Sequence, residues 1–207
     1  MTQRWLALEL ASTIRHDGHG GVTDDLATAQ AATEWLRGQP DLPADWLPAS
    51  GAEIDEDLRT SITELRRAIR ALFAHGVSPA PPSPADAHRL IPPDQALAHL
   101  NAVAARERVT PRLDWPTGAA PVVRLLSDET DPGARLLGAL SRAAIDFLSG
   151  PHFPQLHACT APRCVRYFVK SHGRQEWCKP SCGNRARAAR HYQRRQGGPA
   201  VESAGAS

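Results

Sequence analysis

The sequence predicts a mainly α-helical protein with a small β-hairpin, an α+β chain with a helical N-terminal part and a small cysteine-rich C-terminal part. Three observations support this class. Apolar residues recur at helical spacing in several stretches of residues 1–150. The period changes to two over residues 109–115, as in a β-strand. All four cysteines of the chain lie within residues 159–182.

Length and composition set the broad class. A chain of 207 residues has room for one medium domain and a small one. Its 42% hydrophobic and 22% charged residues are ordinary for a globular protein. No stretch approaches the roughly 20 apolar residues that a membrane span needs, and Glu9 interrupts the apolar N-terminus. We therefore expect a cytoplasmic protein with reduced thiols and no membrane contact.

The N-terminal elements are predicted to be a buried segment, a polar loop and a helix. The run Leu6–Ile14 is apolar enough to be buried. Residues 16–25 contain two histidines and three aspartates, which can bind metal or catalyse a reaction, but the glycines among them favour a flexible turn that contacts a ligand. Thr28 is the predicted N-cap of a helix over residues 29–37, which Gly38 ends.

The strongest helical pattern runs from about Ala52 to His75. Its apolar residues recur four and three positions apart and form one stripe: Leu58, Ile62, Leu65, Ile69 and Leu72. Four arginines lie off the stripe, and we predict that they form a solvated face: Arg59, Arg66, Arg67 and Arg70. Gly76 ends this helix, and the proline-rich residues 77–93 read as a loop or linker.

A helix, a hairpin and a final helix complete the N-terminal part. The first helix starts at Pro93 or Asp94. Apolar and polar residues alternate over 109–115, a turn follows at 116–118, and residues 122–126 are rich in β-formers, which together predict a two-stranded hairpin. Arg112 falls on its polar side, where it can reach a ligand or form a surface ion pair. The last helix is predicted from Pro132 to about Ser149.

The cysteines form two close pairs, Cys159-x4-Cys164 and Cys178-x3-Cys182, with thirteen residues between them. Two such pairs can surround one tetrahedral ion, and zinc is the usual ion for four thiolates. Four thiolates leave no open coordination position, so we expect one structural Zn²⁺. Two disulfides are the alternative, but they need an oxidising compartment.

Charge is divided unevenly along the chain. Residues 159–195 contain ten Lys and Arg against one acidic residue, Glu176, for a net charge of +9. Residues 1–158 contain fourteen basic and twenty acidic residues, for a net charge of −6. A solvated face is the simplest interpretation of a charge run. The adjacent cysteine pairs and the near absence of acidic residues favour a nucleic-acid-binding module attached to an acidic body.

The segment after Cys182 is a good helix former, rich in Arg and Ala. At about 100° per residue, Arg187, Arg190 and Arg194 share one, cationic face of this helix. The opposite face should pack, and it contains Ala188, Ala189 and Tyr192, with Arg185 among them. We therefore expect Arg185 to be structural and to bond backbone carbonyls or zinc-bound thiolates. The predicted nucleic-acid contacts are Lys179, Arg187, Arg190, Arg194 and Arg195.

These motifs resemble a known pair of domains. Trp177, the second cysteine pair and the tetrad Cys182-Gly183-Asn184-Arg185 resemble the CGNR zinc finger, which is named for this tetrad. The runs Leu-Glu-Leu-Ala-Ser-Thr at 8–13 and Pro-Arg-Leu-x-Trp at 111–115 resemble the ABATE domain. The resemblance implies a bacterial, stress-induced transcription regulator, with Trp177, Gly183, Asn184 and Arg185 as structural motif residues. Residues 169–176 depart from the family, which usually has an Asp and a turn rich in Ser and Arg there.

The sequence thus predicts an ABATE-like regulatory or sensor domain over 1–150, a CGNR-type finger over 151–195 and a disordered tail over 196–207. We expect a zinc-dependent regulator that binds DNA at a bacterial nucleoid. An RNA-binding zinc protein, and an enzyme or ligand-binding activity in the N-terminal domain, stay open as alternatives. We expect no enzyme, because residues 1–150 contain no phosphate loop, nucleophile elbow or dinucleotide fingerprint.

Two further partners stay open, a homodimer and a small-molecule effector. The candidate ligand contacts are His16, Asp25 and Arg112.

Overall fold

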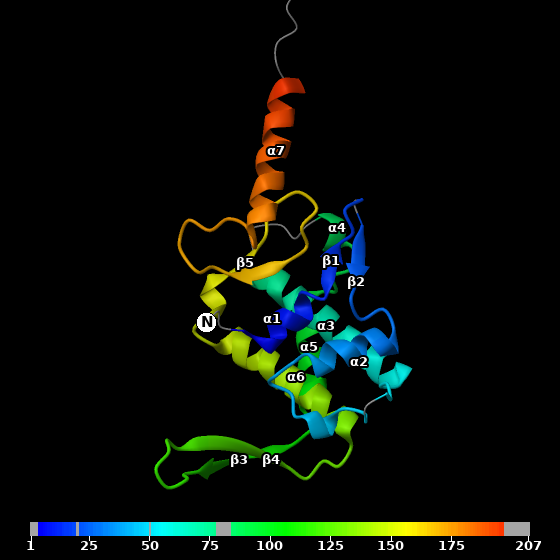
Figure 1. Cartoon of the computed structure of the whole chain (residues 1–207), viewed down its shortest axis with the longest axis vertical. Helices are drawn as coiled ribbons and strands as arrows, with labels where there is room; N and C mark the ends of the chain where they lie inside the picture. The colour runs from blue at the N-terminus through cyan, green and yellow to red at the C-terminus, as the bar shows by residue number, and fades with distance from the viewer. Residues whose placement is uncertain (1–3, 20, 50, 78–83, 197–207) are drawn as a thin grey trace, which may run out of the picture.

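The computed structural model of the chain describes residues 4–19, 21–49, 51–77 and 84–196. It confirms the predicted class, because a helical body carries small two-stranded sheets and ends in a finger with a hairpin and a helix. The hairpin of β3 (Val109–Asp114) and β4 (Val122–Ser127) projects from one end of the body, and helix α7 (Pro180–Gln196) projects from the other (Figure 1). The predicted disordered tail lies outside the described residues, except for Gln196, which is the last residue of α7.

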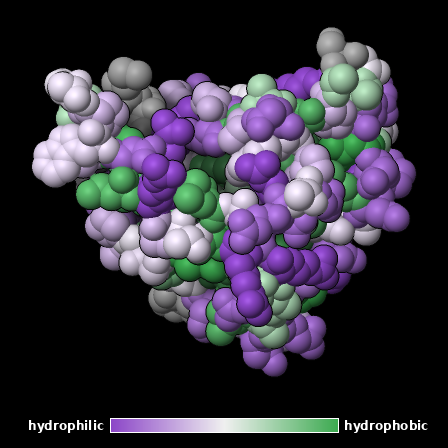
Figure 2. Space-filling model, turned by 90° about the horizontal axis from the view of Figure 1, so that it is seen from below, coloured by the Kyte–Doolittle hydropathy of each residue, from purple (hydrophilic) through white to green (hydrophobic). Residues whose placement is uncertain are grey.

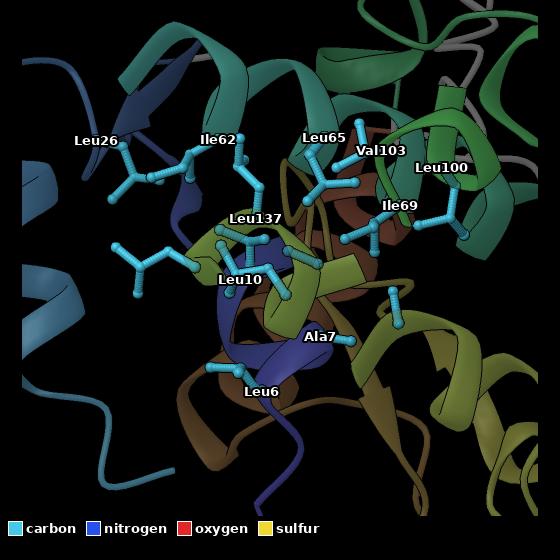
Figure 3. Packing of buried hydrophobic residues seen from close by; sticks show 14 of the residues in the cluster. Leu6, Ala7, Leu10, Leu26, Ile62, Leu65, Ile69, Leu100, Val103 and Leu137 are labelled. Atoms are coloured by element: carbon cyan, nitrogen blue, oxygen red, sulfur yellow. The ribbon is translucent and has the colours of Figure 1, made fainter. Parts of the chain in front are cut away.

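The body is built around the long helix α3 (Glu56–Gly76), which contacts α1 (Leu6–Ala11), α5 (Pro93–Ala104) and α6 (Pro132–Ser149). The smaller helices are α2 (Ala29–Arg37), α4 (Pro84–Ala87), η1 (Ala44–Trp46) and η2 (Phe153–Gln155). Figure 3 shows the apolar side chains of α1, α3, α5 and α6 meeting in one core. No helix in the described part of the chain is long and apolar enough to cross a membrane.

The helix boundaries follow their capping residues. Thr28 accepts a hydrogen bond from the Ala31 N–H, which confirms the predicted start of α2. Helix α3 starts four residues later than predicted, because Asp55 is extended and its carboxylate accepts a hydrogen bond of 2.7 Å from the Leu58 N–H. Asp131 caps α6 in the same way. Each cap satisfies backbone donors that have no partner inside the helix.

Three antiparallel hairpins accompany the helices in the residues that the structure describes. They pair β1 (Ile14–His16) with β2 (Val22–Asp24), β3 (Val109–Asp114) with β4 (Val122–Ser127), and β5 (Leu156–Ala158) with β6 (Tyr167–Val169). The first replaces the loop predicted over residues 16–25. Its turn is closed by Asp17 Oδ1, which accepts hydrogen bonds of 2.7 Å from His19 N and 3.0 Å from Gly21 N. The polar residues of this segment therefore build a turn between two short strands.

Two arginines of α3 correct the predicted solvated face. Arg66 is 5% exposed and Arg70 is 3% exposed, whereas Arg67 faces the solvent as predicted. Arg66 donates 2.6 Å and 2.9 Å hydrogen bonds to Asp24 Oδ2 and Thr13 Oγ1. The periodicity of α3 identified only the side that packs on apolar helices. It did not reveal that a polar hairpin covers the adjacent side.

The hairpin β3–β4 leaves its apolar face open to solvent. Leu113 lies opposite Val123 and Pro111 opposite Leu125 on one face of the pair. The exposed fractions of Leu113, Val123 and Leu125 are 62%, 66% and 52%. Figure 2 views the molecule from this end and shows hydrophobic residues at the surface between hydrophilic ones. The alternation of apolar and polar residues predicts that one face of the hairpin is buried. In the structure, the body covers only the base of this hairpin.

The finger hairpin β5–β6 shares the core of the body. Leu156 and Tyr167 belong to the same buried cluster as Phe73 of α3 and Phe147 of α6. The rings of Phe73 and Tyr167 lie 5.6 Å apart in an edge-to-face arrangement. Because its strands have only three residues each, this hairpin is too small to form a core of its own. The finger is therefore fixed to the body by shared packing.

Candidate metal centre and cationic helix

The four cysteines come from three short elements that meet at one point. Cys159 follows β5, Cys164 precedes β6, Cys178 precedes α7 (Pro180–Gln196), and Cys182 lies in the first turn of α7. All four are free thiols, and three are buried. Their sulfur atoms all lie within 4.8 Å of one another. The predicted ligands are therefore brought together by the β5–β6 hairpin and the start of one helix.

The distances between the sulfurs fit a single tetrahedral ion. They are 3.8 Å for Cys164–Cys178, 3.6 Å for Cys178–Cys182 and 3.9 Å for Cys164–Cys182. Four sulfurs bound to zinc at roughly 2.3 Å stand about 3.8 Å apart at the corners of a tetrahedron. A disulfide would need about 2.0 Å between two of them. The cluster thus has the spacing of a metal site with four sulfur ligands.

The thiols compete for protons in the absence of metal. Hydrogen bonds from Cys164 and Cys178 lower the pKa of Cys159, and the same contacts with Cys159 raise the pKa of Cys164 and Cys178. One thiolate is thus stabilised by neighbours that stay protonated. Cysteine binds metal as the thiolate, so metal binding by Cys164 and Cys178 must release protons.

Arg163 shapes the loop between the first two cysteines and attaches it to the body. Its φ of 63° is left-handed, a conformation that is costly for a residue with a side chain. Its guanidinium donates a 2.9 Å hydrogen bond to the carbonyl oxygen of Gly18 in the β1–β2 turn. Sequence analysis missed this contact because the two residues are 145 positions apart.

Arg185 joins the cysteine cluster to the same hairpin. Its Nη2 lies 3.4 Å from Cys182 Sγ, and its Nη1 lies 2.7 Å from Nε2 of His16. Burial lowers the pKa of His16, and the positive charge of Arg185 lowers it further. Both effects favour the neutral imidazole over the charged one. His16, a candidate ligand contact, is thus engaged in the interface between the body and the finger.

The other residues of the tetrad position the start of α7 against Trp177. A Cβ built on Gly183 would stand 2.8 Å from Cε3 of Trp177, so a side chain here would collide with the ring. Asn184 Oδ1 accepts a 2.6 Å hydrogen bond from Arg187. The guanidinium carbons of Arg187 and Arg190 lie 5.7 Å and 5.6 Å from the Trp177 ring centroid. These two arginines are therefore oriented by an aromatic face.

The packing face of α7 differs from the predicted one. Cys182, Gly183 and Ala186 are buried, whereas Ala188 and Tyr192 are exposed. The start of α7 packs on the rest of the finger, and its C-terminal part projects away from the rest of the molecule (Figure 1). The predicted nucleic-acid contacts are all exposed: Lys179, Arg187, Arg190, Arg194 and Arg195. Helix α7 contains five arginines and no acidic residue.

The remaining candidate ligand residues do not meet at one site. Asp25 accepts a 2.9 Å hydrogen bond from Nε of Arg15. Arg112 forms an ion pair of 3.4 Å with Asp114 on β3, at the opposite end of the molecule from His16 (Figure 1). Each of these charges is thus paired locally, and the structure supports no shared pocket for the three residues.

Two protein-family models match the chain. Residues 5–151 match the family model ABATE, described as "Putative stress-induced transcription regulator". Residues 155–195 match the family model of the CGNR zinc finger. The search of curated proteins gave no match.

Proposed function

The chain belongs to the ABATE family and carries a CGNR zinc finger, and on this premise we propose that it is a zinc-dependent, DNA-binding transcription regulator. In this proposal the finger is the DNA-binding module, and it holds one zinc ion through Cys159, Cys164, Cys178 and Cys182. The zinc supplies the structural link that fixes the start of α7, because a finger of this size gains much of its folding energy from its metal.

The main observation that supports DNA binding is the exposed, cationic helix α7. It has 17 residues, so it is about 25 Å long, and the major groove of DNA admits an α-helix. With five arginines and no acidic residue, it presents a positively charged surface to the DNA backbone. The N-terminal body is acidic, so DNA is attracted to the finger with α7 and repelled from the body.

The four exposed arginines of α7 divide into two groups by their contacts. Arg187 and Arg190 are held against Trp177, so they can be presented to DNA with little loss of side-chain entropy. Arg194 and Arg195 are exposed in the projecting part of the helix and suit phosphate contacts. An RNA target would use the same charges, which makes RNA an outcome to be tested.

Salt-dependent binding to duplex DNA tests the proposal. The double variant Arg194→Gln/Arg195→Gln should weaken binding at all sequences and reduce the slope of log K against log salt by about 2. A matched control is Arg106→Gln/Arg108→Gln, which removes two exposed arginines from the body and should leave the slope unchanged. Equal slopes for both variants would exclude α7 as the DNA-binding surface. Stronger competition by folded RNA than by duplex DNA would favour the RNA alternative.

A further inference from the structure

A cleft of about 530 Å³ lies where the base of β3–β4 meets α6 and the start of α1. Its lining combines large apolar and aromatic side chains with a few charged ones. The apolar side chains that line it include Trp5, Trp46, Leu125, Ala139, Ala143 and Phe147. Small-molecule sites in proteins usually have this size and this composition. The exposed apolar face of the hairpin thus contributes one wall of a cleft at its base.

One cation in this cleft has no counter-charge. Arg135 lies over Trp46, with its guanidinium carbon 4.5 Å from the ring centroid, and its Nε is buried without a hydrogen-bond partner. Among the residues that the structure describes, no ion pair joins Arg135 to a carboxylate. The other two arginines of the cleft, Arg142 and Arg4, are paired with Glu107 and Glu9.

We propose that this cleft binds a small aromatic carboxylate. The carboxylate would pair with the guanidinium of Arg135, and the ring would pack on the apolar lining. A half-buried guanidinium beside aromatic side chains favours an anion with an apolar body, because the pair gains charge-assisted hydrogen bonds in a partly dry site. Asp41 and Asp146 also line the cleft, but both are exposed to water, so their charges are screened.

Aromatic contacts continue from this cleft to the finger. Trp5 lies 5.8 Å from Phe147, Phe147 lies 5.3 Å from Phe73, and Phe73 lies 5.6 Å from Tyr167 of β6. A ligand held against Trp5 and Phe147 would therefore touch the same row of rings that positions the finger hairpin. Any effect of such a ligand on DNA rests on the proposed function, whereas its binding to the cleft does not.

Calorimetric titration of the full-length, zinc-loaded chain with naphthoate tests the site. We expect saturable binding of one naphthoate per chain, and binding of the neutral naphthamide weaker by about tenfold. Arg135→Gln should weaken naphthoate binding to a similar extent and leave naphthamide binding nearly unchanged. Arg112→Gln is the matched control, because this arginine lies on the polar side of the β3–β4 hairpin, outside the cleft lining. It should not affect the binding of either ligand.

A second variant tests the cleft without touching its charge. Ala139→Leu, in the wall formed by α6, should fill the space and weaken both ligands, while the helix tolerates leucine well. Absence of naphthoate binding, or binding that neither Arg135→Gln nor Ala139→Leu changes, would overturn the proposal. The DNA titrations with the α7 variants require no ligand, so failure of this site and failure of the proposed function are distinguishable.

Discussion

The guanidinium of Arg70 donates a 2.8 Å hydrogen bond to the carbonyl oxygen of Val165, the residue that follows the metal-site cysteine Cys164. The same side chain forms a buried ion pair with Asp86 and lies 5.3 Å from the Tyr167 ring centroid. A residue in the centre of the body helix α3 thus contacts the finger beside its metal site. Body and finger are joined by a buried cation as well as by shared apolar packing.

Arg70→Met should destabilise the whole chain. The substitution leaves Asp86 as a buried carboxylate without its partner and the Val165 carbonyl without its donor, so we expect a loss of about 3 kcal/mol in the free energy of unfolding. Urea denaturation measures this loss. Arg67→Met, on the exposed side of the same helix, should cost less than about 1 kcal/mol. Equal losses for the two variants would show that the Arg70 contacts contribute little.

Purified chain should contain one zinc ion, and its removal should affect the body as well as the finger. Because Leu156 and Tyr167 pack in the body's core, chelation should lower the melting temperature of a single cooperative transition. Elemental analysis and calorimetry measure both quantities. Cys182→Ser should lose the zinc, whereas Ser181→Ala, at the exposed neighbouring position, should keep it. A zinc-free chain with two disulfides would contradict the proposed metal centre.

Asp24→Asn should destabilise the chain at neutral pH but not in acid. Burial raises the pKa of Asp24, but the hydrogen bonds and charge of Arg66 outweigh it and hold the pKa below its usual value of 3.8. The stabilisation by the charged form is therefore complete above the unfolded-state pKa and is lost as the pH falls through the lower, folded-state pKa. We expect a difference of about 2 kcal/mol at pH 7 that vanishes in strong acid.

Urea denaturation between pH 2 and pH 7 measures this dependence. The exposed Asp45 of η1 provides a control, because Asp45→Asn should give a stability curve parallel to that of the natural sequence. A difference for Asp24→Asn that stays constant with pH would mean that the ion pair with Arg66 does not set its stability contribution.

Gly183→Ala should destabilise the finger, although Ala is the better helix former by about 1 kcal/mol. The new methyl group would stand 2.8 Å from the Trp177 ring and must displace it, together with the arginines that lie over it. Zinc affinity and the melting temperature should both fall. Ala188→Gly, at an exposed position of the same helix, should cost only its helix propensity and leave zinc affinity unchanged. Higher stability of Gly183→Ala would indicate that Trp177 moves without cost.

The sequence by itself determined the longer helices and the cysteine cluster, because both depend on local spacing. It did not predict the short helices α1 and α4, since residues 6–14 are expected only to be buried and residues 77–93 to be a loop or linker. The apolar stripe of α3 and the cap residues Thr28 and Asp131 fix where helices form and which side packs, through contacts a few residues apart. The two cysteine pairs, thirteen residues apart, have few geometries other than a common ion. The fold class and the clustering of the four cysteines were therefore predictable from the sequence.

Only the tertiary structure decided the roles of the arginines and the exposure of β3–β4. Periodicity gives the direction of a side chain but not what covers it, so it could not distinguish Arg70, which is buried against the finger, from the exposed Arg67. The partner of Arg185, His16, is 169 positions away. Likewise, the apolar face of β3–β4 stays open because no other element in the described part of the chain lies over it (Figure 1). Such contacts depend on how distant segments come together, which local patterns do not encode.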